Sequence, residues 1–349
     1  MRPVFVLPAR IKDNPYLTLL YDAVRAQGDF DPRPFSWKGI FVAVCMRQHP
    51  IMHIHWETTI YGSKSVIVSG VRGACRFVGL WVARLLGARV VWTMHNSASH
   101  DYPHPRIDTG GRALMWRLAD AVIIQNKSVI GKYQKIHPQS RVVFIPHGNY
   151  VGVYGPRADA QRAQRRSSYG FSENDTVLLA LGAIRPYKQY EHLIDTICTA
   201  HKKDGRLKLL IAGKGEHGYI EGLHRRVAGS TAVVIHEGRV PDADMAGLLA
   251  LADYAVFAYG ESSLTSGALL LALSYGVPSI VGRMHAAELI TDGLNGFRAP
   301  DDASLLRTIV RLPSCKPMDH DDIVASVRDF GWDRVAQDTA ALYRSLSVA

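Results

Sequence analysis

Cysteine is scarce in this sequence, and its few cysteines are scattered. Only 4 of the 349 residues are cysteines, Cys45, Cys75, Cys198 and Cys315, and no two of them form a CxxC pair. This spacing argues against a disulfide framework and against a structural metal site. It favours a reducing, cytoplasmic location.

Long uninterrupted apolar runs are also missing. The longest apolar stretch, residues 65–91, contains Arg72, Arg76, Arg84 and Arg89, and arginine is costly in the middle of a bilayer. The opening apolar run VFVLP, residues 4–8, is too short for a signal-peptide core. We therefore expect neither a transmembrane helix nor secretion.

Acidic residues are outnumbered by basic ones. The chain has 41 Lys and Arg against 31 Asp and Glu, a formal net charge of +10. This excess indicates an anionic partner, which could be nucleic acid, acidic lipid or a phosphorylated substrate. Because the sequence shows no aromatic RNA-binding signature and no helix-turn-helix pattern, we do not expect nucleic acid. A basic nucleic-acid-binding or membrane-binding protein without enzyme activity is the remote alternative.

What the sequence does contain is a regular alternation of strand-like apolar runs with helix-period segments, which predicts an α/β fold. Expected strands in the first half are 4–8, 51–55, 89–94, 121–125 and 141–145. Those in the second half are 176–184, 208–215, 232–238, 254–260 and 278–282. A segment rich in Pro, Gly and Arg at 145–166 separates two Rossmann-like halves. We expect domains at 1–150 and 151–330, followed by a terminal helix within 331–349.

Two cations follow the first strand of the second half. In LGAIRPYKQYEHLIDTI, residues 181–197, the strand ends at Gly182, the loop carries Arg185 and Lys188, and a helix begins. Cations at a helix N-terminus can hold a diphosphate, whose negative charge grows as a glycosidic bond to it breaks. From the charge pattern alone, a solvated surface loop is an equal alternative.

A second helix N-terminus follows the strand at 254–260. Thr265, Ser266 and Gly267 precede a uniformly apolar helix, and its free N–H groups could receive a phosphate or ribose oxygen. A core helix with an ordinary serine cap is the alternative.

Polar and aromatic residues also gather after strands of the first half. His53 and His55 lie on one face of a strand, but no third ligand has suitable spacing, so we expect core histidines and no metal site. The residues that would face a cleft at the strand ends are Asn14, Tyr16, His55, Trp56, Glu57, His95 and Asn96.

Five blocks in this order resemble the xanthan-type GDP-mannose β-1,4-mannosyltransferase family, a membrane-associated group of inverting glycosyltransferases with the GT-B fold. They are NPYLTLLYDAV (14–24), MHIHWE (52–57), TMHNSASHD (93–101), LGAIRPYK (181–188) and LTSGALLLALS (264–274).

The resemblance implies two Rossmann-like domains whose parallel sheets face each other across a cleft, with the terminal helix crossing back to the N-terminal domain. The second domain would bind a sugar nucleotide, GDP-mannose, through Gly182, Arg185, Lys188 and the Thr265–Gly267 segment. Arg239 and Val240 would lie beside the nucleobase. The first domain would hold a polyprenyl-diphosphate-linked oligosaccharide acceptor near Asn14, Tyr16, His55, Trp56 and Asn96.

Inversion requires a base that takes the proton of the acceptor hydroxyl. The candidates are Asp101, His95 and Glu57, and Asp101 ranks first because its Ser-Ala-Ser-His-Asp loop extends beyond the strand. With two cations and a helix end to stabilise the leaving diphosphate, we expect no metal and no cofactor.

The Glu-x7-Glu motif of retaining GT-B enzymes is absent, which favours inversion. A retaining GT-B enzyme that uses a UDP- or GDP-sugar is the alternative. The resemblance also implies a peripheral location on the inner face of the plasma membrane, in exopolysaccharide or glycolipid assembly. Arg72, Arg76 and Arg84, interleaved with Phe77, Leu80 and Trp81, could contact anionic lipid, unless they form an ordinary solvated helix face.

Overall fold

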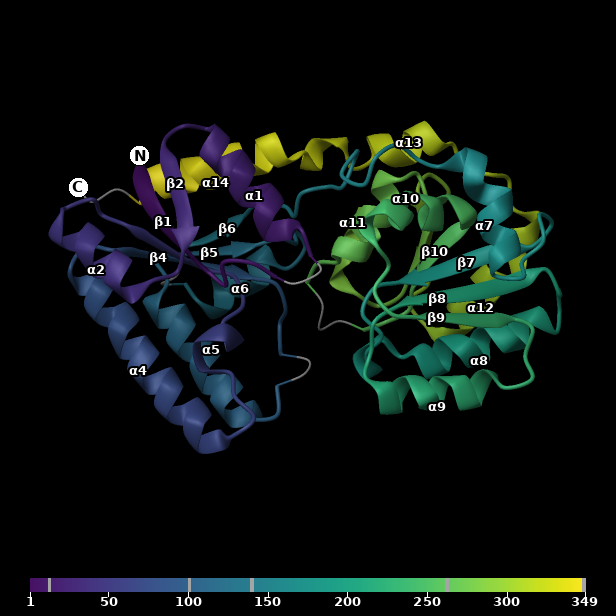
Figure 1. The fold of residues 1–349 in the computed structure, drawn as a ribbon, viewed down its shortest axis with the longest axis horizontal. Coiled ribbons are helices and arrows are strands. Elements are labelled where there is room, and N and C mark those ends of the chain that lie inside the picture. Colours follow the sequence, from purple (N-terminus) through teal and green to yellow (C-terminus); the bar gives the residue numbers. More distant parts are fainter. Residues whose placement is uncertain (12–13, 100–101, 139–140, 261–263, 347–349) are drawn as a thin grey trace. The chain divides into compact units, whose positions relative to one another are not determined.

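A computed structural model describes residues 1–11, 14–99, 102–138, 141–260 and 264–346 (Figure 1). The chain forms two compact units. Unit 1 contains the chain up to Gly148, the described residues 264–265 and the segment from Phe330 onward. Unit 2 contains the chain from Asn149 to the end of the loop after its fourth strand, and then Ser266–Asp329.

Unit 1 is built on a parallel six-stranded sheet with the strand order β2-β1-β3-β4-β5-β6. Its strands are β1 (Arg2–Leu7), β2 (Phe30–Pro34), β3 (Ile51–Ile54), β4 (Arg89–Met94), β5 (Ala121–Ile124) and β6 (Val142–Phe144). Its helices are α1 (Tyr16–Ala26), α2 (Trp37–Cys45), α3 (Thr58–Tyr61), α4 (Val66–Leu85), α5 (Pro105–Leu118), α6 (Ile130–Ile136) and α14 (Trp332–Ser345).

The core of unit 1 lies on both faces of this sheet. Because side chains alternate along a strand, Val4 and Val6 of β1 face α1 and α14, while Phe5 faces the opposite side, where residues of α2 to α5 pack. Figure 1 shows α1 and α14 on one side of the sheet and α4 and α5 on the other. The terminal helix is thus an integral part of unit 1.

Unit 2 has a second parallel six-stranded sheet with the order β12-β11-β10-β7-β8-β9. Its strands are β7 (Thr176–Leu181), β8 (Leu207–Gly213), β9 (Val233–Glu237), β10 (Tyr254–Phe257), β11 (Ser279–Val281) and β12 (Gly296–Arg298). Its helices are α7 (Arg162–Ser168), α8 (Tyr190–His201), α9 (His217–Val227), α10 (Asp242–Leu251), α11 (Gly267–Ser274), α12 (Asp302–Arg311) and α13 (His320–Ala325). Because the strands are parallel, the loops that follow β10, β7, β8 and β9 lie side by side along one edge of the sheet, in that spatial order.

The ten strands expected from the sequence are all present, but β2 and β12 were not predicted. The β2 segment is Phe-Asp-Pro-Arg-Pro, which has no apolar run, and β12 has three residues. Both are edge strands that pair on one side only, where proline and short length are tolerated. The apolar pattern of the sequence therefore did not predict β2 and β12, which are strands because they pair with a neighbouring strand.

Helix α4 differs from expectation. We predicted no transmembrane helix, but by length and composition α4 could cross a membrane, and most of its apolar window is not buried. The residues that were expected to face lipid are divided between two environments. Phe77 and Leu80 are buried in the core of unit 1, whereas Trp81 is 53% exposed.

Candidate functional site

Lys188 is a buried cation at the carboxyl end of the unit 2 sheet. It ends the short 3-10 helix Pro186–Lys188 after β7, and its exposed fraction is 7%. The ammonium lies 5.6 Å from the centre of the Tyr259 ring, an attractive cation–π arrangement. Burial lowers the pKa of Lys188 to about 8. Among the described residues, no carboxylate forms an ion pair with this ammonium group.

Glycine at position 182 makes room for this ammonium group. Gly182 has a φ of +112°, and a Cβ built there would lie 3.0 Å from the Nζ of Lys188. A side chain at position 182 would therefore be strained and would crowd the cation. Gly213, at the end of β8, allows a similar close approach, because a Cβ there would lie 2.0 Å from the carbonyl oxygen of Gly182. The two strand ends are packed backbone to backbone beside Lys188.

Arg185 lies in the same loop but in a different environment. Its side chain is 33% exposed, and its Nη1 donates to Glu216 at 2.9 Å. The Glu216 side chain is 77% exposed, so this ion pair is a surface contact that contributes little to stability. An anionic ligand could therefore displace Glu216 from this contact at small cost.

The predicted helix end after β10 is formed by Ser266. Its Oγ accepts from the backbone N–H of Leu269 at 3.2 Å and lies 3.0 Å from the Tyr259 hydroxyl. Tyr259 thus contacts both Lys188 and the cap of α11. Gly267 is the first residue of α11, whereas Thr265 groups with unit 1.

The segment expected to contact the nucleobase follows β9. Val240 is buried, and Arg239 forms an exposed ion pair with Asp242 at 3.0 Å. The predicted donor residues of unit 2 therefore lie after β7, β9 and β10, in the connecting segments or at the start of the helix that follows. This is the edge where ligands of open α/β sheets bind.

A cavity of about 810 Å³ opens at the same edge, lined in part by Pro186, Gln189 and Tyr259. Its other polar lining includes the carboxylates of Glu191, Asp301 and Asp302 together with His192 and Arg283. Arg283 donates to the carbonyl of Pro300 at 2.6 Å, and His192 lies 3.2 Å from Asp302. Because three carboxylates face one arginine, this cavity suits hydroxyl groups better than phosphate, whereas the side of Tyr259 that faces Lys188 suits a diphosphate.

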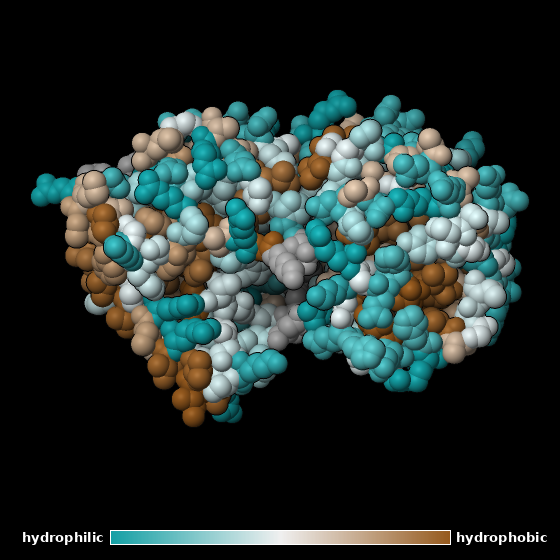
Figure 2. Space-filling model, in the orientation of Figure 1, coloured by the Kyte–Doolittle hydropathy of each residue, from teal (hydrophilic) through white to brown (hydrophobic). Residues whose placement is uncertain are grey.

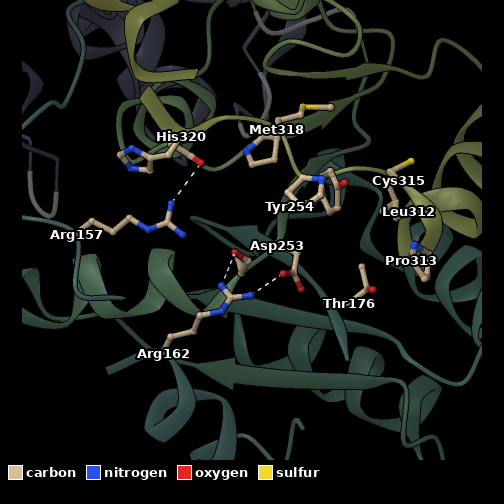
Figure 3. Close-up of a pocket in the computed structure, with 14 residues that line it drawn as sticks. Arg157, Arg162, Thr176, Asp253, Tyr254, Leu312, Pro313, Cys315, Met318 and His320 are labelled. Carbon is tan, nitrogen blue, oxygen red and sulfur yellow. Dashed lines mark hydrogen bonds and ion pairs between the residues drawn. The ribbon is translucent and has the colours of Figure 1, made fainter. Parts of the chain in front are cut away.

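A second cavity, of about 430 Å³, lies at the opposite, amino-terminal edge, next to Thr176 and Tyr254 (Figure 3). Its two arginines are already engaged within the protein. Arg162 pairs with Asp253 at 2.6 Å, and Arg157 donates to the carbonyl of Tyr275 at 2.9 Å. This cavity therefore does not present uncompensated charge to a ligand.

Unit 1 places a hydrogen-bonded row of histidines under its carboxyl edge. The hydroxyl of Tyr21, from α1, lies 2.7 Å from Nδ1 of His53 and 2.6 Å from Nε2 of His55. Nδ1 of His55 lies 3.3 Å from Nε2 of His95. Nε2 of His53 lies 2.8 Å from the hydroxyl of Thr93. Both histidines of the MHIHWE block therefore have partners within the protein.

Burial keeps these imidazoles neutral. It lowers the pKa of His53 to about 3 and that of the neighbouring His147 to about 4. The pKa values of His55 and His95 also lie well below the ordinary value because of burial. In the part of the chain that the structure describes, no group of three or more His, Cys, Asp or Glu side chains is arranged to hold a metal ion.

His95 and Trp56 form a stacked pair at this edge. Their ring centres are 4.1 Å apart with an interplanar angle of 6°. Tyr16 meets both rings edge-on, at 5.3 Å from His95 and 6.3 Å from Trp56. Gln125 donates to the Tyr16 hydroxyl at 2.9 Å. The predicted residues Tyr16, His55, Trp56 and His95 are thus brought together.

The other described first-half candidates are Asn14, Glu57 and Asn96, and they make different contacts. Asn14 accepts from the backbone N–H of Tyr16 at 2.9 Å and shapes the start of α1. The carboxylate of Glu57 is buried, pairs with Arg112 and accepts from the indole of Trp92. Arg112 also donates to the carbonyl of Asn96 at 2.9 Å. Asp101 lies outside the described residues.

Sequence reasoning missed several residues that organise these groups. Tyr21 is at helical spacing from Leu17 and so resembled a core residue. Arg112 and Asp108 of α5 hold the loop after β4, and Asp108 accepts from Ser99 Oγ at 2.7 Å. No local signal links α5 to that loop, because the contacts depend on how the chain folds back.

Comparison with known proteins agrees with this arrangement. Residues 175–314 match the family model described as glycosyl transferases group 1. The chain is 27% identical over 291 residues to a GDP-mannose:glycolipid 4-beta-D-mannosyltransferase of Xanthomonas campestris pv. campestris, covering 80% of this chain and 72% of the relative. A second relative with the same name and species is 27% identical over 277 residues, covering 76% and 68%.

Solved structures share the fold. Alr3699/HepE of Anabaena in complex with UDP-glucose superimposes with a TM-score of 0.74 at 15% identity, covering 98% of this chain and 99% of that one. Sucrose-phosphate synthase of Thermosynechococcus elongatus gives a TM-score of 0.72 at 17% identity, covering 99% of each.

The protein is therefore a glycosyltransferase with the GT-B fold. Its resemblance to the GDP-mannose-dependent β-1,4-mannosyltransferases, first indicated by five short blocks, extends over most of the chain.

Proposed function

We propose that this enzyme transfers mannose from GDP-mannose, with inversion, onto a polyprenyl-diphosphate-linked oligosaccharide in exopolysaccharide or glycolipid assembly. The names of the two relatives support the donor and a glycolipid acceptor. The observation that carries the proposal is Lys188, a buried ammonium group without a carboxylate partner among the described residues. A buried cation of this kind is stabilised by an anionic ligand.

In the proposed reaction, the diphosphate of the donor lies between Lys188, Arg185 and the N-terminus of α11. The bond from the anomeric carbon to the diphosphate oxygen breaks as the acceptor hydroxyl attacks from the opposite side. Negative charge then grows on the leaving GDP, and fixed cations stabilise it. These groups supply the charge compensation without a divalent metal or a cofactor.

A screen of nucleotides tests the donor. Thermal unfolding is followed with GDP, UDP, ADP and their mannose and glucose conjugates, since a ligand that binds the native state raises Tm. We expect GDP and GDP-mannose to give the largest shifts. Equal shifts with all nucleotides would contradict the choice of donor, and NMR of the product anomer separates inversion from retention.

For the base we propose Asp101. Of the other two candidates, Glu57 is engaged by Arg112 and Trp92, and His95 is buried under Trp56. Asp101→Asn is expected to lower kcat at least about a hundredfold while the Kd for GDP changes little, because the base acts only on the acceptor. Glu57→Gln is the comparison variant. It is expected to lower Tm, because Glu57 is buried with Arg112 and Trp92, and to lower kcat much less than Asp101→Asn does. A near-normal kcat in Asp101→Asn would exclude this assignment.

We also propose a peripheral location on the inner face of the plasma membrane, with α4 as the contact. Exposed apolar side chains run along this helix, and Figure 2 shows the apolar surface at the lower left, where Figure 1 places α4. They are Val66, Ile67, Val68, Val71, Val78, Trp81 and Leu85.

The arginines of α4 make contacts within the protein. Arg72 and Arg76 donate to backbone carbonyls at 2.8 and 2.7 Å, and Arg84 pairs with Asp120 at 3.0 Å. The apolar face is therefore the main membrane contact, with the net positive charge of the chain adding attraction to anionic lipid.

Vesicle binding tests this contact. In co-sedimentation with phosphatidylglycerol-containing vesicles, Val71→Asp/Val78→Asp is expected to reduce binding by tenfold or more, because charges would have to enter the acyl region. Ile136→Asp, at another exposed apolar position, is the matched control. Equal binding by the double variant and the wild type would refute this use of α4.

A further inference from the structure

We propose that the indole of Trp56 is a stacking platform for a sugar ring of the acceptor, an inference that rests on the proposed glycosyl transfer. Trp56 follows β3 at the carboxyl edge of the unit 1 sheet. It is partly exposed, and His95 covers one face of its ring in a parallel stack. The exposed part of the indole is therefore on its other face and edges.

A flat, partly exposed aromatic ring complements the apolar face that a hexose ring presents through its C–H groups. Small-molecule sites combine such aromatic surfaces with a few polar groups that fix orientation. Here Tyr16 stands edge-on to the indole, and its hydroxyl is held by Gln125. The Oε1 of Gln125 is buried and has no hydrogen-bond partner among the described residues.

The indole is supported by a buried row of hydrogen-bonded polar side chains, and burying them costs free energy. His95 is held by His55, His55 by Tyr21, and Tyr21 also by His53, through the contacts at 3.3, 2.6 and 2.7 Å. His53 and His55 are fully buried, although apolar side chains of similar size would fill this space at lower cost. A hydrogen-bonded row fixes ring orientations in a way that apolar packing does not. We assign Tyr21 and His55 as positioning residues that hold His95, and through it Trp56, in one orientation.

The test separates acceptor binding from donor binding. Acceptor KM is measured at saturating GDP-mannose with synthetic alkyl-diphosphate-linked disaccharides as the acceptor probe. Trp56→Leu is expected to raise acceptor KM roughly tenfold, the loss of one aromatic contact, while the Kd for GDP stays within twofold. Tyr21→Phe, which keeps the ring and removes the bridging hydroxyl, is expected to raise acceptor KM severalfold with kcat less affected.

Trp116→Leu is the matched control, because Trp116 stacks on His137 at 3.8 Å and has no part in the platform. An acceptor KM within twofold of the wild type in Trp56→Leu, or an equal rise in Trp116→Leu, would overturn the assignment. Saturation-transfer NMR with the same probe needs no turnover and should show transfer to sugar ring protons that Trp56→Leu abolishes. Failure of the wild type to use any sugar nucleotide would instead contradict the proposed function.

Discussion

Replacing Lys188 by methionine is expected to lower kcat/KM by about 10² to 10³-fold and, at the same time, to raise Tm by a few degrees. The activity is lost because the leaving diphosphate loses a desolvated cation. The stability rises because methionine fills the same space beside Tyr259 without a buried charge. Steady-state kinetics with GDP-mannose and thermal unfolding of the same preparation measure both effects.

The stability gain should depend on pH in a defined direction. The pKa of Lys188 is lowered from 10.5 to about 8 in the folded protein, so its cost to folding is complete below pH 8 and shrinks as the pH rises towards 10.5. The Tm advantage of Lys188→Met should therefore be larger at pH 7 than at pH 10.

Arg185→Ala is the comparison for Lys188. Because Arg185 is one-third exposed and already shares its charge with Glu216, we expect a tenfold to few-hundredfold loss of kcat/KM and no gain in Tm. If Lys188→Met retained wild-type kcat/KM, the placement of the diphosphate beside Lys188 would be wrong.

Acidification from pH 7.5 to 5.5 is expected to destabilise unit 1 by several kcal/mol. Four histidines, His53, His55, His95 and His147, are neutral in the folded state, with pKa values below the ordinary value of 6.5. The unfolded chain binds protons below pH 6.5 that the folded chain does not bind, so stability falls as the pH drops from 6.5 towards about 4. Each such histidine contributes about 1.4 kcal/mol per pH unit in that window.

Denaturant unfolding at a series of pH values measures this slope. Glu57, whose pKa is raised by burial, acts in the opposite direction but is a single group. His217→Gln replaces an imidazole that is 81% exposed and should leave the slope unchanged. A free energy of unfolding that is constant between pH 7.5 and 5.5 would show that the histidines are not held neutral.

Much of the strand pattern was predictable because apolar runs of β-type spacing are local. The helix after β7 was predictable for the same reason, since its apolar residues recur at helical spacing. Four of them, Tyr190, Leu193, Ile194 and Ile197, are buried in the structure. Edge strands were not predictable, since β2 is a strand by its pairing with β1 and has little intrinsic preference for one. The lipid-facing side of α4 was also assigned incorrectly for Phe77 and Leu80, because both faces of that helix are apolar.

The sequence by itself determined that this chain is a two-part α/β protein, that Arg185 and Lys188 follow a buried strand, and that its family resemblance is to a group of mannosyltransferases. These conclusions rest on neighbouring residues and on the order of short blocks. The tertiary structure alone decided that Lys188 is buried over Tyr259, while Arg185 is one-third exposed and pairs with Glu216. It also decided that the buried His53 and His55 lie beneath a stacked His95–Trp56 pair. The reason is that burial, charge pairing and ring stacking depend on partners distant in sequence, which only the folded chain brings into contact.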